Sequence, residues 1–352
     1  MLEAIVQPSL EVEIIQSAVP TPGEGEILIK VICSGVNPKD WKSVVYSNTP
    51  SNSGDDIAGV VEQVGGQVVG FRKGDRVAAF HQMKTPHGSF AEYAIAPAHT
   101  TFHLPDGIPF EDAATVPLAA FTAAVGLYHC LRLTPPWDPA TTPTPLVVYG
   151  ASSAVGAFVV KLASRSNIHP IIAIAGNGRP MVEKLLDASK GDVVIDYRQG
   201  QEHVVRSVQQ VMKGQRVDFA FDSISEKGSP ELMARLLAPH GHATFVLLEK
   251  DYSAVADKIL TSLTYVGYVH TGPFPVNPKN GITSNRAGFG HDLGTVYSSL
   301  FTRGLQDGWL IGHPYEVVAG GLRGLPGALR DLRDGKASAK KFVMRTQETR
   351  ID

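Results

Sequence analysis

The sequence predicts an α/β protein in which a β-rich part precedes a doubly wound parallel sheet. Residues 11–95 hold short β-branched runs punctuated by Gly and Pro, a pattern typical of a small twisted β domain. Between residues 146 and 248, apolar strand-like runs alternate with helical segments, which a doubly wound parallel sheet accommodates most simply. The 352 residues suffice for two domains of ordinary size.

The elements are expected in the following order. Strands of the β-rich part are expected at residues 11–15, 26–32, 57–65, 74–80 and 87–95. At residues 110–117 the alternation stops, Ala-rich helical segments begin, and a Pro-rich stretch at residues 133–145 resembles a linker. Strands of the parallel sheet are expected at residues 146–149, 170–175, 192–197, 217–222 and 243–248. After about residue 268 the pattern becomes irregular, and residues 341–344 form the last strand-like segment.

The segment from Leu146 to Arg165 carries the clearest functional signal. An apolar run meets a turn of small residues, GASSAVG, and then an apolar spacing that suits a helix. Such a turn leaves backbone N–H groups at a helix N-terminus, where they and the helix dipole can stabilise a pyrophosphate. The match to G-x-G-x-x-G is partial, because Ala151 and Ser153 replace the first two glycines and only Gly156 remains. A buried strand, turn and helix without a ligand is therefore the alternative.

Composition and charge argue against several classes of partner. The chain is 43% hydrophobic and 19% charged, with a formal net charge of −2, so no basic field would recruit nucleic acid or an anionic membrane. Cys33 and Cys130 lie far apart without a C-x-x-C motif. We see no secretory signal and no apolar run of about 18 residues. We expect a cytoplasmic chain without disulfides and without a nucleic-acid or membrane partner.

Several motifs then occur in one order along nearly the whole chain. They are Val36–Lys42, Gly54–Val61, Gly74–Val77, Gly88–Tyr93, Ala113–Pro117, the central turn, Gly312–Pro314, Gly320–Leu322 and Gly335–Lys341. With them the chain resembles the medium-chain dehydrogenase/reductase superfamily, in its zinc-independent quinone-oxidoreductase branch, and most closely the fungal trans-acting enoyl reductases of polyketide synthesis. The resemblance implies a GroES-like catalytic domain of residues 1–117 and 279–352, and a Rossmann NADPH-binding domain of residues 118–278.

The resemblance also bears on zinc. In the zinc-dependent branch a Cys would stand at Asn37 and a His-Glu pair at Asp55 and Asp56. Without thiolate or imidazole at those positions, a carboxylate pair is a poor tetrahedral zinc site. We expect no metal.

The end of the second expected strand bears on the choice of nicotinamide cofactor. An NAD site usually has an acidic residue there, whereas this chain has Asn177 followed by Arg179. An Arg in this position would favour a ribose 2′-phosphate, so we expect NADPH. The resemblance adds Lys184 and Tyr197 to this phosphate site. Alternatively, Arg179 and Lys184 are solvated surface charges.

The resemblance implies further cofactor contacts and the catalytic residues. The remaining expected cofactor contacts are Asn37, Gly150, Ser152, Ser153, Ala154, Val155, Gly156, Leu247 and Lys340. Lys42 is expected to stabilise the enolate oxygen of an enoyl thioester, Thr122 to bind cofactor or substrate, and Tyr46 to donate a proton. An ordinary packed tyrosine is the alternative for Tyr46.

The reaction implied by the resemblance is NADPH-dependent reduction of an activated C=C bond. The substrate would be a polyketide intermediate on an acyl-carrier domain of a synthase, met in trans by a monomer rather than a homodimer. Two alternatives stay open from the residues. One is a stand-alone quinone or enone reductase, and the other is a nucleotide-binding protein with a non-reductive, cyclising or accessory role.

Overall fold

The computed structural model describes residues 1–273, 280–282 and 290–350, and the chain divides into two compact units. Unit 1 comprises Met1–Leu118 and His291–Asp352, and unit 2 comprises Ala119–Gly290. The expected second domain boundary, between residues 278 and 279, lies outside the described residues.

Unit 2 is built on a six-stranded sheet with the order β10-β9-β8-β11-β12-β13, and every neighbouring pair of strands is parallel. The strands are β8 (Leu146–Tyr149), β9 (Ile171–Ala175), β10 (Val193–Asp196), β11 (Phe219–Asp222), β12 (His242–Phe245) and β13 (Leu260–Leu263). The strand order reverses between β8 and β11, and the carboxyl ends at such a point form the usual crevice for a ligand. The predicted doubly wound sheet is confirmed.

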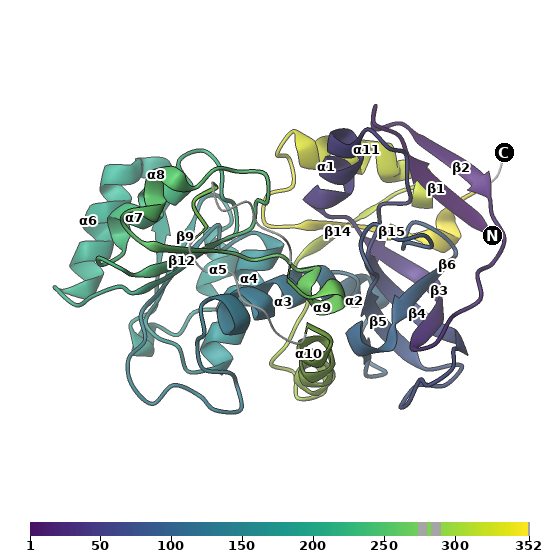
Figure 1. Cartoon of the computed structure of the whole chain (residues 1–352), viewed down its shortest axis with the longest axis horizontal. Coiled ribbons are helices and arrows are strands. Elements are labelled where there is room, and N and C mark those ends of the chain that lie inside the picture. Colours follow the sequence, from purple (N-terminus) through teal and green to yellow (C-terminus); the bar gives the residue numbers. More distant parts are fainter. Residues whose placement is uncertain (274–279, 283–289, 351–352) are drawn as a thin grey trace. The chain divides into compact units, whose positions relative to one another are not determined.

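Helices cover both faces of this sheet. Strand residues pack with buried side chains of α6 (Gln201–Met212), α7 (Ser229–Leu236) and α8 (Ser253–Ala256) in one cluster, and Figure 1 shows these helices together above β9 and β12. Helix α4 (Ala154–Arg165) contacts β8, β9 and β11 but contributes nothing to that cluster. The buried run from Gly156 to Ala163 fixes α4 against the sheet. The sheet therefore has the two covered faces that near-continuous apolar strands require.

Unit 1 contains a seven-stranded sheet and a separate hairpin. The sheet follows the order β14-β15-β3-β4-β5-β7, with β6 also paired to β3. Its strands are β3 (Glu26–Gly35), β4 (Asp56–Val64), β5 (Arg76–Phe80), β6 (Tyr93–Pro97), β7 (Thr101–His103), β14 (Tyr315–Val318) and β15 (Lys341–Arg345). The hairpin joins β1 (Leu2–Val6) to β2 (Val12–Gln16). Because β15 pairs with β3, the end of the chain completes the sheet begun by its start.

The helices of unit 1 come from both ends of its sequence. They are α1 (Pro38–Ser47), α2 (Phe110–Ala113), α10 (Gly290–Gln306, which starts one residue before the unit) and α11 (Leu325–Arg333). Buried residues of α1 and α11 share a core cluster with β1 and β15. This packing holds α1, which carries several of the expected site residues, against the returning tail.

One helical stretch is long and apolar enough to cross a membrane by length and composition alone. It runs from Phe110 to Cys130, through α2, α3 (Pro117–Ala124) and a π-helical turn, and 89% of its most apolar window is buried. Our inspection of the sequence missed it, because Pro117 and the acidic residues Glu111 and Asp112 interrupt the apolar run. A core helix passes the same test, so the stretch is weak support for a membrane span.

Candidate functional site

The turn between β8 and α4 brings backbone segments into close contact at the carboxyl end of the sheet. Gly150 has a φ of 73°, in the left-handed region that favours glycine. A Cβ on Gly156 would lie 2.3 Å from the carbonyl oxygen of Gly150, so only glycine lets α4 approach this closely. The Ser153 hydroxyl caps α4 by accepting from the Gly156 N–H at 3.0 Å.

Three backbone N–H groups at the start of α4 and in the turn before it have no acceptor in the described part of the chain. These are the N–H groups of Ser152, Ala154 and Val155. They stand in the turn and the first two positions of a twelve-residue helix, where the positive end of the dipole also lies. The turn therefore fits a pyrophosphate despite its partial motif.

The segment after β11 supports the turn, although its residues were not predicted to belong to the site. Ser223 Oγ donates to the Tyr149 carbonyl at 2.7 Å and lies 3.0 Å from Ser153 Oγ. Ile224 closes over the turn, since a Cβ on Gly150 would lie 2.4 Å from its Cγ1. The available signal was the pair Ser223 and Ser225 directly after the strand next to β8.

Asp222 anchors this supporting segment. Its Oδ1 accepts from the backbone N–H groups of Ile224 at 3.0 Å and Ser225 at 2.8 Å, and its Oδ2 accepts from the Ser229 hydroxyl at 2.5 Å. Burial raises the pKa of Asp222 to about 6, although these hydrogen bonds oppose the rise. The carboxylate thus fixes the loop but is costly to keep ionised.

A second group of residues lies where β9 and β10 end. The Tyr197 ring covers Gly176, because a Cβ on that glycine would lie 2.8 Å from ring Cε1. Arg198 donates to Asp196 through Nη2 at 2.7 Å and Nε at 2.9 Å, and also donates to the Asn177 side chain. These hydrogen bonds hold the pKa of Asp196 well below its usual range. Tyr197 was predicted from the sequence to lie in this site, whereas the adjacent Arg198 was not.

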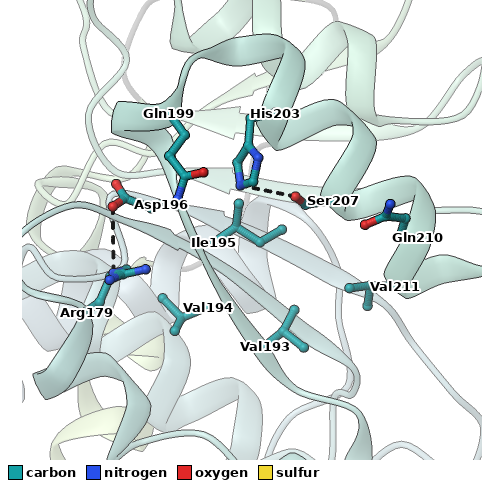
Figure 2. Close-up of a pocket in the computed structure, with 10 residues that line it drawn as sticks. All are labelled: Arg179, Val193, Val194, Ile195, Asp196, Gln199, His203, Ser207, Gln210 and Val211. Carbon is teal, nitrogen blue, oxygen red and sulfur yellow. Dashed lines mark hydrogen bonds and ion pairs between the residues drawn. The ribbon is translucent and has the colours of Figure 1, made fainter.

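Arg179 shares the same carboxylate. Its Nε lies 3.9 Å from Asp196 Oδ2, so two guanidinium groups face one carboxylate and the local charge is positive. Arg179 and Asp196 also line a pocket of about 370 Å³ between β10 and α6, with His203, Ser207 and Gln210 along its helical wall (Figure 2). A 2′-phosphate would meet excess positive charge at this end of the sheet.

Three other expected residues of unit 2 have separate surroundings. Lys184 caps the C-terminal end of α5 (Arg179–Glu183) and is exposed. Leu247 lies just beyond β12, and its carbonyl accepts from the Tyr252 hydroxyl at 2.8 Å. Thr122 is buried in α3, with 5% of its surface exposed.

In unit 1, Asn37 precedes α1 and joins a buried triangle of polar side chains. Lys341 Nζ donates to Asn37 Oδ1 at 2.9 Å and to the Asp56 carboxylate. Asn37 Nδ2 donates to Asp56 Oδ2 at 2.7 Å. The other Asp56 oxygen accepts from the Leu118 N–H at 2.7 Å. Lys341 and Asp56 are 3% and 0% exposed, so the triangle is an ion pair shielded from water.

A second charged cluster lies beside it. Lys39 pairs with Asp55 and, at 2.9 Å, with Asp40. Asp55 Oδ1 lies 2.8 Å from His81 Nδ1. Burial raises the pKa of Asp40 to about 7, while Lys39 and His81 outweigh burial at Asp55 and lower its pKa. Asp55 and Asp56, which stand where the zinc-dependent branch has zinc ligands, thus bind ammonium and imidazole groups. The described residues contain no His, Cys, Asp or Glu cluster able to hold a metal.

The remaining expected residues of unit 1 lie nearer the surface. Lys42 Nζ lies 5.6 Å from the centre of the Trp41 ring in α1. Tyr46 is 65% exposed and meets the same ring edge-on at 6.2 Å. Lys340 pairs with Glu316 at the surface, whereas its neighbour Lys341 contacts Asn37.

Comparisons with known proteins identify the family. The family model of the alcohol dehydrogenase GroES-like domain matches residues 23–106. Trans-enoyl reductase fsr4 of Gibberella fujikuroi is 44% identical over 329 residues, covering 92% of each chain. Trans-enoyl reductase resD of Aspergillus sclerotiorum is 30% identical over 355 residues, covering 93% of this chain and 94% of that protein. This chain belongs to the trans-enoyl reductase family.

The folds of both units agree with membership of the trans-enoyl reductase family. The GroES-like match confirms the expected fold of the β-rich part, and unit 2 has the expected Rossmann-like parallel sheet. The solved structure of an alcohol dehydrogenase superfamily protein from Novosphingobium aromaticivorans shares this fold with a TM-score of 0.78, at 20% identity over 98% of this chain and 99% of that one. The family is one of nicotinamide-dependent oxidoreductases that act on C=C bonds.

Proposed function

We propose that this protein is an NADPH-dependent reductase of the α,β-double bond of an enoyl thioester. The observation that carries the cofactor choice is the pairing of Arg179 and Arg198 around Asp196 at the end of β9 and β10. An NAD site places an acidic residue after the second strand, and this chain has Asn177 there, hydrogen-bonded to Arg198. The 2′-phosphate of NADPH supplies the negative charge that these two arginines leave unbalanced.

The rest of unit 2 would hold the cofactor along the carboxyl ends of its strands. The N–H groups of Ser152, Ala154 and Val155 would bind the pyrophosphate. Tyr197, already fixed against Gly176, would direct its hydroxyl to the 2′-phosphate, with Lys184 as a further cation. Leu247 from unit 2 and Asn37 and Lys340 from unit 1 are proposed for the other parts of the cofactor.

In this reaction the protein would align the substrate with the cofactor and stabilise the negative charge that develops on the substrate. When bound, NADPH would supply the hydride that the β-carbon of the thioester accepts. The ammonium of Lys42 would stabilise the negative charge that develops on the thioester oxygen. Tyr46 would deliver a proton to the α-carbon, and Thr122 would hold substrate or cofactor by its hydroxyl.

The acyl group would arrive on a carrier domain. Both relatives named above are trans-enoyl reductases, so we propose that this chain acts in trans, as a cytoplasmic monomer, on an acyl chain bound to the acyl-carrier domain of a polyketide synthase. The thioester supplies the electron-withdrawing carbonyl that makes the β-carbon accept hydride.

One titration tests this proposal. The purified protein is titrated with NADPH and with NADH, and NADPH oxidation is followed after addition of a crotonyl or longer enoyl thioester. Tighter binding of NADPH and thioester-dependent oxidation are expected. Oxidation by a simple quinone or enone but by no thioester would favour the stand-alone reductase, and NADPH binding without oxidation of any acceptor would favour a non-reductive role.

A further inference from the structure

The buried triangle of Asn37, Asp56 and Lys341 fixes the Asn37 carboxamide in one orientation. An ammonium group only donates and a carboxylate only accepts hydrogen bonds. Asn37 Oδ1 therefore faces Lys341 at 2.9 Å, and Nδ2 faces Asp56 at 2.7 Å. Turning the amide over would set donor against donor and acceptor against acceptor. One N–H of Nδ2 donates to Asp56, and among the described residues no group accepts from the second.

The start of α1 is arranged so that the Asn37 side chain is spared from capping. Asparagine at an N-cap ordinarily accepts from a backbone N–H of the first helical turn. Here the Asp40 carboxylate accepts from the Asn37 N–H at 2.7 Å, and the Asp40 N–H donates to the backbone carbonyl of Asn37 at 2.9 Å. The carboxamide is thus held by Lys341 and Asp56 instead of by the helix.

The fold also makes room for the ammonium. A Cβ on Gly35 would lie 2.2 Å from the Ala114 carbonyl oxygen and 2.9 Å from Lys341 Cε, so glycine at this point of β3 leaves room for both the Ala114 backbone and the lysine stem. A buried ion pair is weak support for stability, because well-packed apolar residues of similar volume often serve as well. The orientation that the ion pair imposes on the Asn37 carboxamide is a consequence that apolar residues could not provide.

We propose that Lys341 is a positioning residue for cofactor binding. Together with Asp56 it holds the Asn37 carboxamide so that the second N–H of Nδ2 meets a hydroxyl of the nicotinamide ribose. This inference rests on the proposed NADPH function and adds a residue that does not itself touch the cofactor.

The test removes both charges at once and compares two ligands. Lys341→Met alone would bury an unpaired Asp56 carboxylate and could prevent folding. The double variant Lys341→Met/Asp56→Asn avoids that charge and keeps an oxygen for the Leu118 N–H. Dissociation constants are measured for NADPH and for adenosine 2′,5′-bisphosphate, which lacks the nicotinamide ribose. We expect NADPH to bind about tenfold more weakly, or about 1.4 kcal/mol, and the bisphosphate to bind unchanged.

Two further variants separate this inference from the proposed function. Lys336→Met/Asp331→Asn removes a surface pair of the same chemistry and should leave both constants unchanged. Asn37→Ala should weaken NADPH alone, and adding it to the Lys341/Asp56 variant should cause no further loss, because both changes remove one contact.

Three results would overturn the inference. Equal weakening of both ligands in the double variant would mean a general structural role. Additive losses in the triple variant would mean that Lys341 does not act through Asn37. An Asn37→Ala variant that binds NADPH normally would mean that Asn37 does not contact the cofactor, so Lys341 could not act through it. A wild-type protein that fails to bind NADPH would instead contradict the proposed function itself.

Discussion

Arg198 and Asp196 form a two-point ion pair at the end of β10, with contacts of 2.7 Å and 2.9 Å. The pair neutralises one of the two arginines that face this carboxylate, and Arg179 provides the remaining positive charge. Because Arg198 also donates to Asn177, the pair sets the guanidinium beside the residue that replaces the acidic side chain of an NAD site.

Replacing Arg198 should change the choice of cofactor. Hydrogen bonds to a charged group contribute about 1.5 to 3 kcal/mol, so Arg198→Ala should weaken NADPH binding by about tenfold or more. NADH binding should stay the same, because NADH has no 2′-phosphate. Fluorescence titration with both cofactors measures the ratio of the NADPH and NADH dissociation constants. Arg206→Ala, at an exposed arginine on α6, is the control and should leave it unaltered.

A methyl group at Gly156 should disturb the turn. Alanine there would set Cβ 2.3 Å from the Gly150 carbonyl oxygen and 2.8 Å from Ala151 Cα, and both neighbours are backbone atoms that cannot swing aside. We expect a loss of about 1 to 3 kcal/mol in the free energy of unfolding and weaker NADPH binding.

The matched control for this change is Gly327→Ala in α11. No atom lies within 4 Å of its added Cβ, so the helix should gain stability, by up to about 1 kcal/mol. Chemical denaturation of both variants compares the two. Equal stability of Gly156→Ala and wild type would contradict the close approach of α4 to β8.

The buried Asp222 should make stability depend on pH. Its folded pKa of about 6 lies above its ordinary value of 3.8, so its contribution to stability is present below about pH 4 and is lost as pH rises through 6. Asp222→Asn has no such titration. The free energy of unfolding of wild type minus that of the variant should therefore fall between pH 4 and 7, by up to about 3 kcal/mol.

The free energy of unfolding is measured by chemical denaturation at each pH for wild type and Asp222→Asn. A constant difference between the two over this pH range would show that burial does not perturb Asp222.

Lys42 should matter for the chemical step rather than for cofactor binding. Removing one donor to a developing oxyanion typically costs 10² to 10³ in kcat, so Lys42→Ala should lose about that much activity while its NADPH dissociation constant stays unchanged. Stopped-flow oxidation of bound NADPH by an enoyl thioester measures the step. Lys73→Ala, at an exposed lysine paired with Glu62, should oxidise NADPH at the wild-type rate. Full activity of Lys42→Ala would remove this residue from the mechanism.

Much of the architecture could be predicted from local patterns. The apolar runs at β8 and β9 and the small-residue turn before α4 are signals contained in consecutive residues, and the structure has these elements where the sequence placed them. The sixth strand, β13, was missed because its four residues include Thr261 and Ser262 and resemble no apolar run. The 17-residue α10 was missed because Gly, Ser and Thr residues obscure its helical spacing.

Several contacts within the site could not be predicted from the sequence, because they depend on how the folded chain places each side chain. Lys340 and Lys341 are adjacent at the point where β15 begins, so the sequence alone does not say which lysine faces inward. The structure buries Lys341 against Asn37 and pairs Lys340 with Glu316. Likewise, the support that Ser223 gives to Tyr149 joins residues 74 positions apart, and their contact follows from the neighbouring positions of β8 and β11.

The most direct test of the central claim is isotope transfer. The protein is mixed with NADPH that carries deuterium at both C4 positions of the nicotinamide and with an enoyl thioester, and the product is analysed by mass spectrometry and NMR. The account predicts a saturated thioester with one deuterium on its β-carbon. A product that carries no deuterium, or a thioester recovered unreduced in the presence of bound NADPH, would contradict it.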